Sequence, residues 1–217
     1  MAELITGLDA GKVRERVAEA RERIAQAAKR AGRDPQSVEL LAAVKYVSLG
    51  ELGILADVGL TLLGENRAQE LVAKAAAYPG AFTWDFIGHL QSRKVKDVAP
   101  RVRYIHSVAS DSVLAQLARH PATVLVEVNV AGEASKSGIA PAELAAFVER
   151  CPVPVAGLMT MPPAVERPEQ NRPHFAALRE LAAAHGLRHL SMGTSQDYEV
   201  AVEEGATIVR LGSTLYR

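Results

Sequence analysis

The chain has 217 residues, 48% of them hydrophobic and 23% charged, and its 25 acidic residues balance its 25 basic ones. This length favours one large domain, slightly below the ~250 residues typical of a (β/α)8 barrel, and zero net charge excludes a bulk attraction to nucleic acid or an anionic membrane. No apolar stretch reaches the ~18 residues of a membrane span, the single Cys151 excludes an internal disulfide, and no secretory signal opens the chain, so we expect a cytoplasmic protein without membrane contact.

The first predicted element is an amphipathic helix over residues 9–31. Apolar side chains recur at spacings of three and four, as at Val13, Val17 and Ile24, and Gly32 follows the last of them. This pattern is typical of a helix that buries one face. Residues 1–34 therefore form an N-terminal helical region ahead of the main fold.

Strand and helix patterns alternate along the rest of the chain. Strands are predicted at residues 38–44, 61–63, 82–87, 102–105, 123–129, 155–159, 188–190 and 207–211. Helices are predicted between them: one starts at a capping box of Ser48 and Glu51, and others cover residues 69–77, 94–98, 110–118, 141–150, 173–184 and 198–204. Eight right-handed βα units predict a parallel sheet closed into one (β/α)8 TIM barrel, residues 38–217.

Polar or small residues lie at or just after the end of every predicted strand. They are Lys45; Gly64, Glu65 and Asn66; Gly88 and His89; His106 and Ser107; Asn129, Glu133 and Lys136; Thr160; Ser191, Met192, Gly193, Thr194 and Ser195; and Arg210, Gly212 and Ser213. In a barrel the loops after the strands form the active face, so we expect these residues to converge on one mouth.

Lys45 ends a buried strand, where burial disfavours the ammonium form and favours condensation with an aldehyde. The small residues around Ser195 and Ser213, with a helix expected to begin near Ser195, indicate a phosphate site. An amine opposite a phosphate cradle predicts a phosphorylated aldehyde or ketone as ligand. Pyridoxal 5′-phosphate (PLP) fits this description, and so does the phosphosugar of a Schiff-base aldolase. His185 and His189 have the spacing of a metal pair but Gly186 lies between them, and no metal site is predicted.

Eight segments together resemble the PLP homeostasis proteins of the alanine-racemase N-terminal-domain-like group. They are VELLAAVK, LGENRAQE, WDFIGHLQSRK, HSVAS, VEVNVAGEASKSGI, GLMTMPP, LSMGTSQDYEVAVEEG and VRLGSTLY, and they cover nearly the whole chain from Val38 onward. The resemblance implies a single-domain, fold-type III barrel that binds PLP through the lysine after the first strand and carries or buffers this cofactor.

The resemblance also implies a set of cofactor-binding residues: Lys45, Asn66, Ser191, Met192, Ser195, Arg210, Gly212 and Ser213. In this set, Lys45 would form the internal aldimine and Asn66 would lie beside the ring. The phosphate would be held by Ser195, Gly212 and Ser213, with Ser191 and Met192 adjacent. Arg210 would face the pyridine nitrogen, where a fixed cation disfavours protonation of the ring and weakens it as an electron sink.

The chain departs from the family pattern at four places. Val44 replaces a usual serine or threonine, Asp85 a histidine and Arg93 an asparagine, and the chain stops at Arg217 without a short glycine-containing tail. These departures leave the role of Lys45 intact but affect the expected contacts at the edge of the ring.

Three functions compete at this stage. The first is a PLP-binding protein without catalytic turnover, expected to be a monomer and with PLP-dependent apoenzymes as candidate partners. The second is a racemase-like PLP enzyme, which would need a second domain to supply an opposing base; no tyrosine or cysteine of the matched segments is expected to take that role. The third is the aldolase, which does not account for Arg210.

Overall fold

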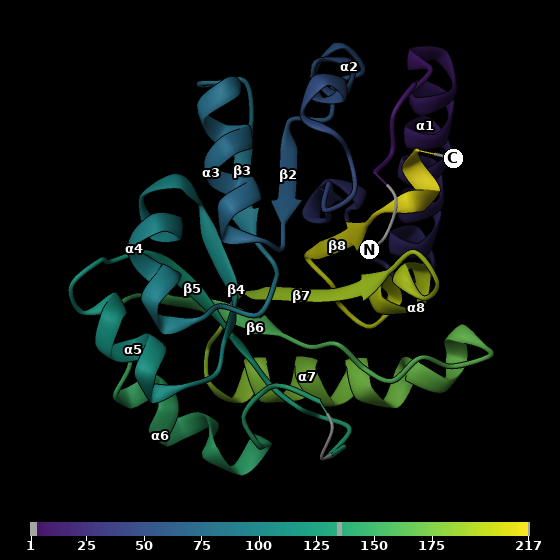
Figure 1. Cartoon of the computed structure of the whole chain (residues 1–217). Coiled ribbons are helices and arrows are strands. Elements are labelled where there is room, and N and C mark those ends of the chain that lie inside the picture. Colours follow the sequence, from purple (N-terminus) through teal and green to yellow (C-terminus); the bar gives the residue numbers. More distant parts are fainter. Residues whose placement is uncertain (1–3, 134–135, 217) are drawn as a thin grey trace.

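Eight parallel strands close into a barrel in the order in which they occur along the chain (Figure 1). The structure is a computed structural model and describes residues 4–133 and 136–216. The strands are β1 (Glu39–Ala43), β2 (Leu62–Glu65), β3 (Thr83–Phe86), β4 (Tyr104–Val108), β5 (Thr123–Glu127), β6 (Val155–Met159), β7 (His189–Thr194) and β8 (Ile208–Leu211). The predicted stop at Arg217 lies outside the described residues. The predicted barrel is confirmed.

Helices surround the strands and complete the βα units (Figure 1). They are α1 (Ala10–Arg30), α2 (Leu52–Asp57), α3 (Ala68–Ala77), α4 (Val95–Val98), α5 (Asp111–Leu117), α6 (Leu144–Glu149), α7 (Arg172–Ala184) and α8 (Tyr198–Glu203), with short 3-10 turns that include η2 (Leu49–Glu51) and η7 (Ser213–Leu215). Among the described residues, no helix has the length and hydropathy that crossing a bilayer requires.

The N-terminal helix α1 forms as its sequence pattern predicts. The Asp9 side chain accepts a hydrogen bond from the backbone N–H of Lys12 at 2.9 Å, which satisfies one of the free donors at the start of the helix. Its apolar stripe is buried in the main core. At its outer edge, Arg30 pairs with Glu203 of α8 at 2.7 Å, so α1 is fixed to the last helix of the barrel.

The barrel interior has an apolar part and a polar part. Leu41, Leu125, Met159 and Ile208 form a small apolar cluster of their own. Four polar side chains, Asp85, His106, Ser191 and Arg210, are buried and joined by hydrogen bonds. Residues next to them on the strands, such as Phe86 and Met192, belong to the larger core, because successive side chains of a strand point to opposite faces.

Three strands extend further than the sequence predicts. β2 continues to Glu65, β4 includes His106 and Ser107, and β7 continues to Thr194, although these residues were expected in the loops that follow. A polar side chain inside a barrel interrupts the apolar pattern from which a strand is predicted. The expectation that His106 and Ser107 lie at the mouth is therefore wrong.

The capping box predicted at Ser48 is also wrong. The Ser48 side chain makes no capping hydrogen bond. Glu51 instead accepts hydrogen bonds from the backbone N–H groups of Gly7 and Leu8, at 2.8 and 3.0 Å. The carboxylate thus ties the N-terminal segment to the loop after β1.

Candidate functional site

A cavity of about 590 Å³ lies at the carboxyl ends of the strands. This volume is within the range of about 300–1,000 Å³ that is usual for small-molecule sites. Its lining residues come from both ends of the chain and from several loops: Ile5, Ala43, Lys45, Tyr46, Asn66, Ile87, Met161, Thr194, Ser195, Gln196, Arg210, Gly212, Ser213 and Tyr216. Six of the eight predicted cofactor-binding residues are among them.

Lys45 lies in the loop that follows β1, two residues beyond the end of the strand. It is half-buried, and its Nζ lies 4.9 Å from the centre of the Tyr46 ring, a cation–π contact. Ile5 is bridged to the same loop: its N–H donates to the Tyr46 carbonyl at 2.7 Å, and its carbonyl accepts from the Ser48 N–H at 3.1 Å. The lysine is therefore presented by a loop that is fixed on both sides.

A buried ion pair is hydrogen-bonded to the backbone of this loop. Lys74 of α3 is 2% exposed and Glu65 of β2 fully buried, and their Nζ and Oε2 atoms are 2.6 Å apart. Lys74 also donates to the carbonyl of Val44 at 2.7 Å, directly before Lys45. The second oxygen of Glu65 accepts from the backbone N–H of Asn66 at 2.7 Å. The sequence analysis missed Lys74, because a helical lysine usually lies in solvent.

Asn66 lies beside Lys45 in the cavity wall. Its Oδ1 atom is buried and has no hydrogen-bond partner among the described residues. Gly88, in the loop after β3, packs against its backbone so closely that a Cβ there would lie 2.1 Å from the Asn66 carbonyl oxygen. The position of Asn66 therefore depends on a residue without a side chain at position 88.

Small polar residues from the loops after β7 and β8 form another part of the cavity wall. The Gly212 N–H lies 3.4 Å from Ser195 Oγ, and Ser195 Oγ is 3.0 Å from Thr214 Oγ1. A Cβ on Gly212 would meet only Ala43, at 3.8 Å, so a larger side chain would extend into free space. The backbone and hydroxyl donors of this wall suit an anion.

The helix expected to begin near Ser195 begins instead at Tyr198. The residues before it form a turn in which Asp197 accepts hydrogen bonds from the Thr194 N–H at 2.7 Å and from Asn171 at 2.8 Å. The helix therefore starts three residues later in the chain than predicted. Its predicted role beside a phosphate stays a prediction.

Arg210 projects from β8 into the barrel and lines the floor of the cavity. Its guanidinium donates through Nη1 to Ser191 Oγ at 2.5 Å and through Nη2 to the Thr160 carbonyl at 2.9 Å. Burial lowers its pKa to about 10, and Asp197 and Glu127 oppose this shift. The pKa remains well above neutral, so the site contains a fixed positive charge.

Ser191 and Met192 lie in β7, outside the cavity wall. Ser191 is fully buried inside the barrel, where it joins Arg210 to His106. The side chain of Met192 points the other way, into the core between barrel and helices. The structure thus brings six of the predicted residues together and places Ser191 behind Arg210.

Eight of the fourteen lining residues were not among the predicted cofactor-binding residues. Two of the eight are tyrosines, Tyr46 and Tyr216, and the Tyr216 hydroxyl is buried with no hydrogen-bond partner among the described residues. Burial raises the pKa of Tyr216 far above its ordinary value, so the phenol keeps its proton at neutral pH. Among residues 4–133 and 136–216, no cluster of three or more His, Cys, Asp or Glu side chains could hold a metal ion.

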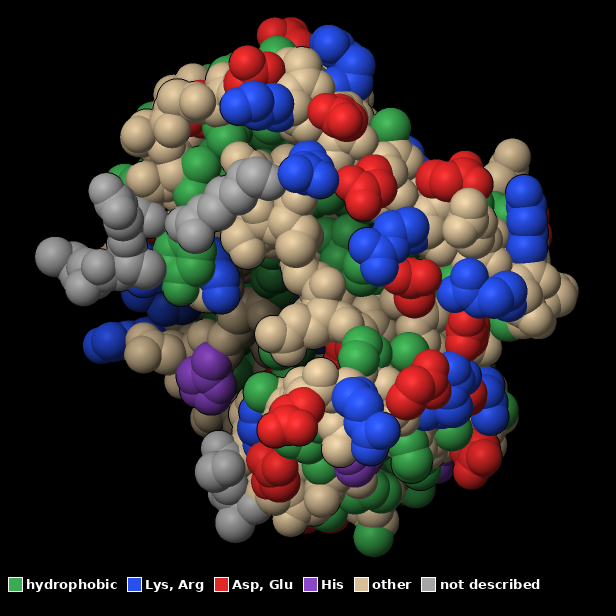
Figure 2. All heavy atoms as spheres, turned by 90° about the vertical axis from the view of Figure 1, so that its right-hand side faces the viewer, with side chains coloured by type: hydrophobic (Ala, Val, Ile, Leu, Met, Phe, Trp, Pro, Cys, Tyr) green, Lys and Arg blue, Asp and Glu red, His purple; other side chains and the backbone are tan. Residues whose placement is uncertain are grey.

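The surface seen from one side of the molecule carries mixed charge. Figure 2 shows acidic and basic side chains interspersed around a recess. Ion pairs also join helices of the described structure, for example Arg172 with Glu203 at 2.6 Å. Neither sign dominates, as the balanced composition predicts.

Comparison with known proteins gives relatives along nearly the whole chain. Residues 16–217 match the family model of the alanine racemase N-terminal domain. A pyridoxal phosphate homeostasis protein of Aquifex aeolicus is 42% identical over 219 aligned residues, covering 93% of this chain and 96% of that one. The structure of PipY from Synechococcus elongatus with PLP bound has a TM-score of 0.79 at 29% identity and covers 94% of this chain and 100% of PipY. An alanine racemase of Corynebacterium glutamicum, at 16% identity and a TM-score of 0.69, shares the fold over 63% of its length.

Proposed function

This chain belongs to the family of pyridoxal phosphate homeostasis proteins, which share the alanine racemase N-terminal domain, and from that premise we propose that it binds PLP at Lys45. The observation that carries this proposal is the cavity itself. It brings together an amine, a set of N–H and hydroxyl donors and a buried guanidinium in one wall of residues.

The residues of this cavity fit PLP. Gly212 leaves open the space that a phosphate needs beside Ser195 and Ser213, because a Cβ there would meet only Ala43. The Oδ1 atom of Asn66 is buried and lacks a hydrogen-bond partner among the described residues, which is costly unless a ligand supplies a donor. The volume is also sufficient for a ring that carries a phosphate.

When bound, PLP supplies an aldehyde that condenses with a primary amine. Lys45 holds that amine, and the pair of Lys74 with Glu65 keeps its loop in place through the Val44 carbonyl. Ser195, Gly212 and Ser213 would donate hydrogen bonds to the phosphate. Arg210 would face the ring nitrogen and disfavour a proton on that atom, since two adjacent positive charges repel.

Uptake and release of the cofactor, and its delivery to PLP-dependent apoenzymes, form the second part of the proposal. Met161 and Ser213 line the cavity and are exposed, so the ligand would remain in contact with solvent. An open site suits transfer of a cofactor better than it suits protection of a reactive carbanion from water. Within this proposal the protein has no catalytic turnover of its own.

The covalent link can be tested by replacing the lysine. Lys45→Ala should abolish the visible absorption of the bound cofactor and leave the unfolding transition of the ligand-free protein unchanged. Borohydride reduction of the loaded wild-type protein, followed by peptide mapping, should locate the adduct on Lys45. Lys94→Ala, a matched change outside the cavity, should retain the absorption. An adduct mainly on Lys94 or Lys136 would overturn the assignment.

A racemase-like activity is the second candidate, and the two cavity tyrosines favour it, because each brings a phenol close to the proposed cofactor site. The charge of Arg210 and the raised pKa of Tyr216 argue against an effective acid–base pair. Incubation of the loaded protein with alanine in deuterated water, followed by NMR, should show no rapid exchange at Cα. Exchange at about 1–10³ per second that is lost in Lys45→Ala would establish the enzyme instead.

A further inference from the structure

A continuous chain of hydrogen bonds crosses the barrel interior below the cavity. Ser191 Oγ lies 2.5 Å from Arg210 Nη1 and 2.8 Å from His106 Nδ1. The other ring nitrogen of His106, Nε2, is 3.1 Å from Asp85 Oδ2. Asp85, His106 and Ser191 are all fully buried, so water does not compete with these bonds.

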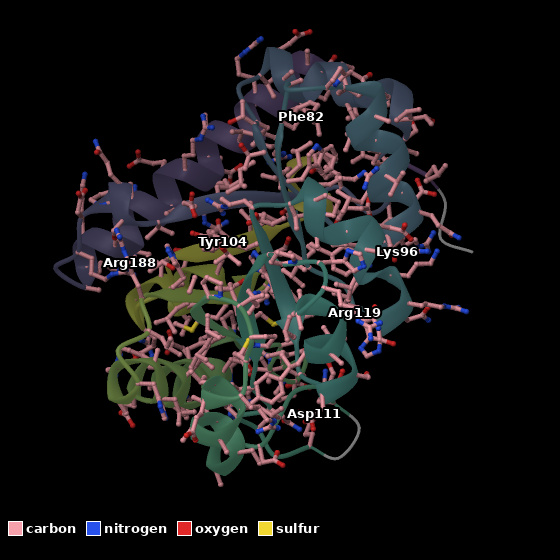
Figure 3. All side chains as sticks on the ribbon, turned by 90° about the vertical axis from the view of Figure 1, so that its left-hand side faces the viewer. Phe82, Lys96, Tyr104, Asp111, Arg119 and Arg188 are labelled. Atoms are coloured by element: carbon pink, nitrogen blue, oxygen red, sulfur yellow. The ribbon has the colours of Figure 1, made fainter. Side chains whose placement is uncertain are left out.

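This chain of hydrogen bonds ends at the opposite side of the barrel. Arg103 binds Asp85 through two bonds, Nε to Oδ1 at 3.1 Å and Nη2 to Oδ2 at 2.7 Å, and Glu39 through Nη1 at 2.6 Å. Tyr104, which follows Arg103 in the sequence, is labelled in Figure 3, seen from the side opposite to that of Figure 2. The polar chain therefore connects the cavity floor with the amino ends of the strands.

The chemistry of the two ends fixes the direction of every bond between them. Arg210 can only donate, and an ionised Asp85 can only accept. Burial raises the pKa of Asp85, but the hydrogen bonds from His106 and Arg103 together lower it by more than burial raises it. The pKa is therefore below its ordinary value, and the carboxylate is ionised. His106 must then donate through Nε2 and accept through Nδ1 from the Ser191 hydroxyl. Burial lowers the pKa of His106, which agrees with this neutral form.

The hydrogen bonds of Arg210 leave two of its five N–H groups for a ligand. One N–H of Nη1 is bound by Ser191, and both N–H groups of Nη2 are bound, by the Thr160 carbonyl at 2.9 Å and the Met161 sulfur at 2.9 Å. The Nε N–H and the second N–H of Nη1 have no hydrogen-bond partner among the described residues, and Arg210 lines the cavity. The guanidinium thus offers N–H groups in a fixed orientation.

We propose that Asp85, His106 and Ser191 are positioning residues that hold Arg210 so that it donates to the ring nitrogen of the ligand. The site thereby prefers an aromatic ring with an unprotonated, hydrogen-bond-accepting nitrogen over a ring without one. This inference rests on the proposed function and adds the selectivity for the ring atom. None of the three residues needs to touch the ligand.

Ser191→Ala is the most direct test, because it removes one hydroxyl and leaves both neighbours in place. Dissociation constants are measured for PLP and for an analogue with carbon in place of the ring nitrogen. The variant should bind PLP about tenfold more weakly, because the loss of one hydrogen bond to a charged group lowers an affinity by about this factor or more. Its affinity for the analogue should remain that of the wild type.

Ser107→Ala is the matched control. Ser107 is also a buried serine of the barrel, but its hydroxyl donates to the Gly88 carbonyl and takes no part in the chain. This variant should not change the ratio of the two affinities. If Ser191→Ala weakens both ligands equally, or neither, the positioning role is wrong.

A second measurement needs no variant and no ligand. Nitrogen-15 NMR of the ligand-free protein should show His106 as the neutral tautomer with its proton on Nε2. A proton on Nδ1, or a charged ring at neutral pH, would overturn the proposed direction of the chain. Failure of the wild-type protein to bind either PLP or the analogue would instead overturn the proposed function, so the two failures are distinguishable.

Discussion

At the scale of single residues, Lys74 and Glu65 affect the site although neither of them lines the cavity. Their ion pair is buried, and it also binds the Val44 carbonyl and the Asn66 N–H. Removing one partner of a buried pair leaves an uncompensated charge, which typically costs about 3–5 kcal/mol. The pair thus contributes both to stability and to the placement of Lys45.

Lys74→Met should therefore lower the free energy of unfolding by about 3–5 kcal/mol, measured by urea denaturation. The control is Lys94→Met, since Lys94 lies 3.8 Å from Asp97 in a partly exposed pair. Such pairs contribute about 0–1 kcal/mol. Equal losses of unfolding free energy in the two variants would show that the buried pair stabilises the fold no more than the exposed pair does.

Part of the cavity could be predicted because its residues follow strands. Lys45, Asn66 and Ser195 were found in this way, since the loops after the strands of a barrel meet at one face. Lys74 could not be found, because its partner Glu65 lies nine residues away on another element. Single residues whose role depends on a distant partner leave no local pattern.

At the scale of elements, the pattern of apolar residues located all eight strands but misplaced some of their ends. β7 was predicted to stop at Leu190 and continues to Thr194. Ser191 therefore faces the barrel interior and Met192 the outer core, which the sequence analysis had placed together beside the phosphate. A strand that buries polar side chains on one face cannot be bounded by hydrophobicity alone.

The prediction of a capping box at Ser48 was wrong for a different reason. The spacing of Ser48 and Glu51 is that of a capping box, yet Glu51 binds Gly7 and Leu8 instead. The N-terminal segment, which precedes α1, competes for the carboxylate. A local motif was overridden by a contact between segments more than 40 residues apart in the sequence.

At the scale of the whole molecule, the buried chain through the barrel makes stability depend on pH. Burial lowers the pKa of His106 below its ordinary 6.5 in the folded protein, and Asp85 only partly offsets this. The unfolded chain therefore binds a proton that the folded chain excludes. Stability from this group is present above the unfolded pKa of 6.5 and is lost as the pH falls towards the folded value.

We expect the free energy of unfolding to fall between about pH 7.5 and 5, with His106 contributing up to about 1.4 kcal/mol per pH unit. In His106→Gln, the slope of the unfolding free energy against pH should decrease over this interval. The decrease should be at most the contribution of one proton, about 1.4 kcal/mol per pH unit. Denaturation with urea at a series of pH values measures the slope independently of any constant loss of stability. An unchanged slope would show that His106 does not take up a proton when the protein unfolds.

The bridge between Ile5 and the loop of Lys45 has a practical consequence for anyone who attaches the protein to a surface or to a fluorophore. Two backbone hydrogen bonds join Ile5 to Tyr46 and Ser48, on either side of Val47. A rigid fusion partner joined just ahead of Leu4 would pull on this loop, and a bulky dye there would lie close to the cavity wall. Immobilisation through an exposed side chain near the end of α1, such as Lys29, avoids both effects.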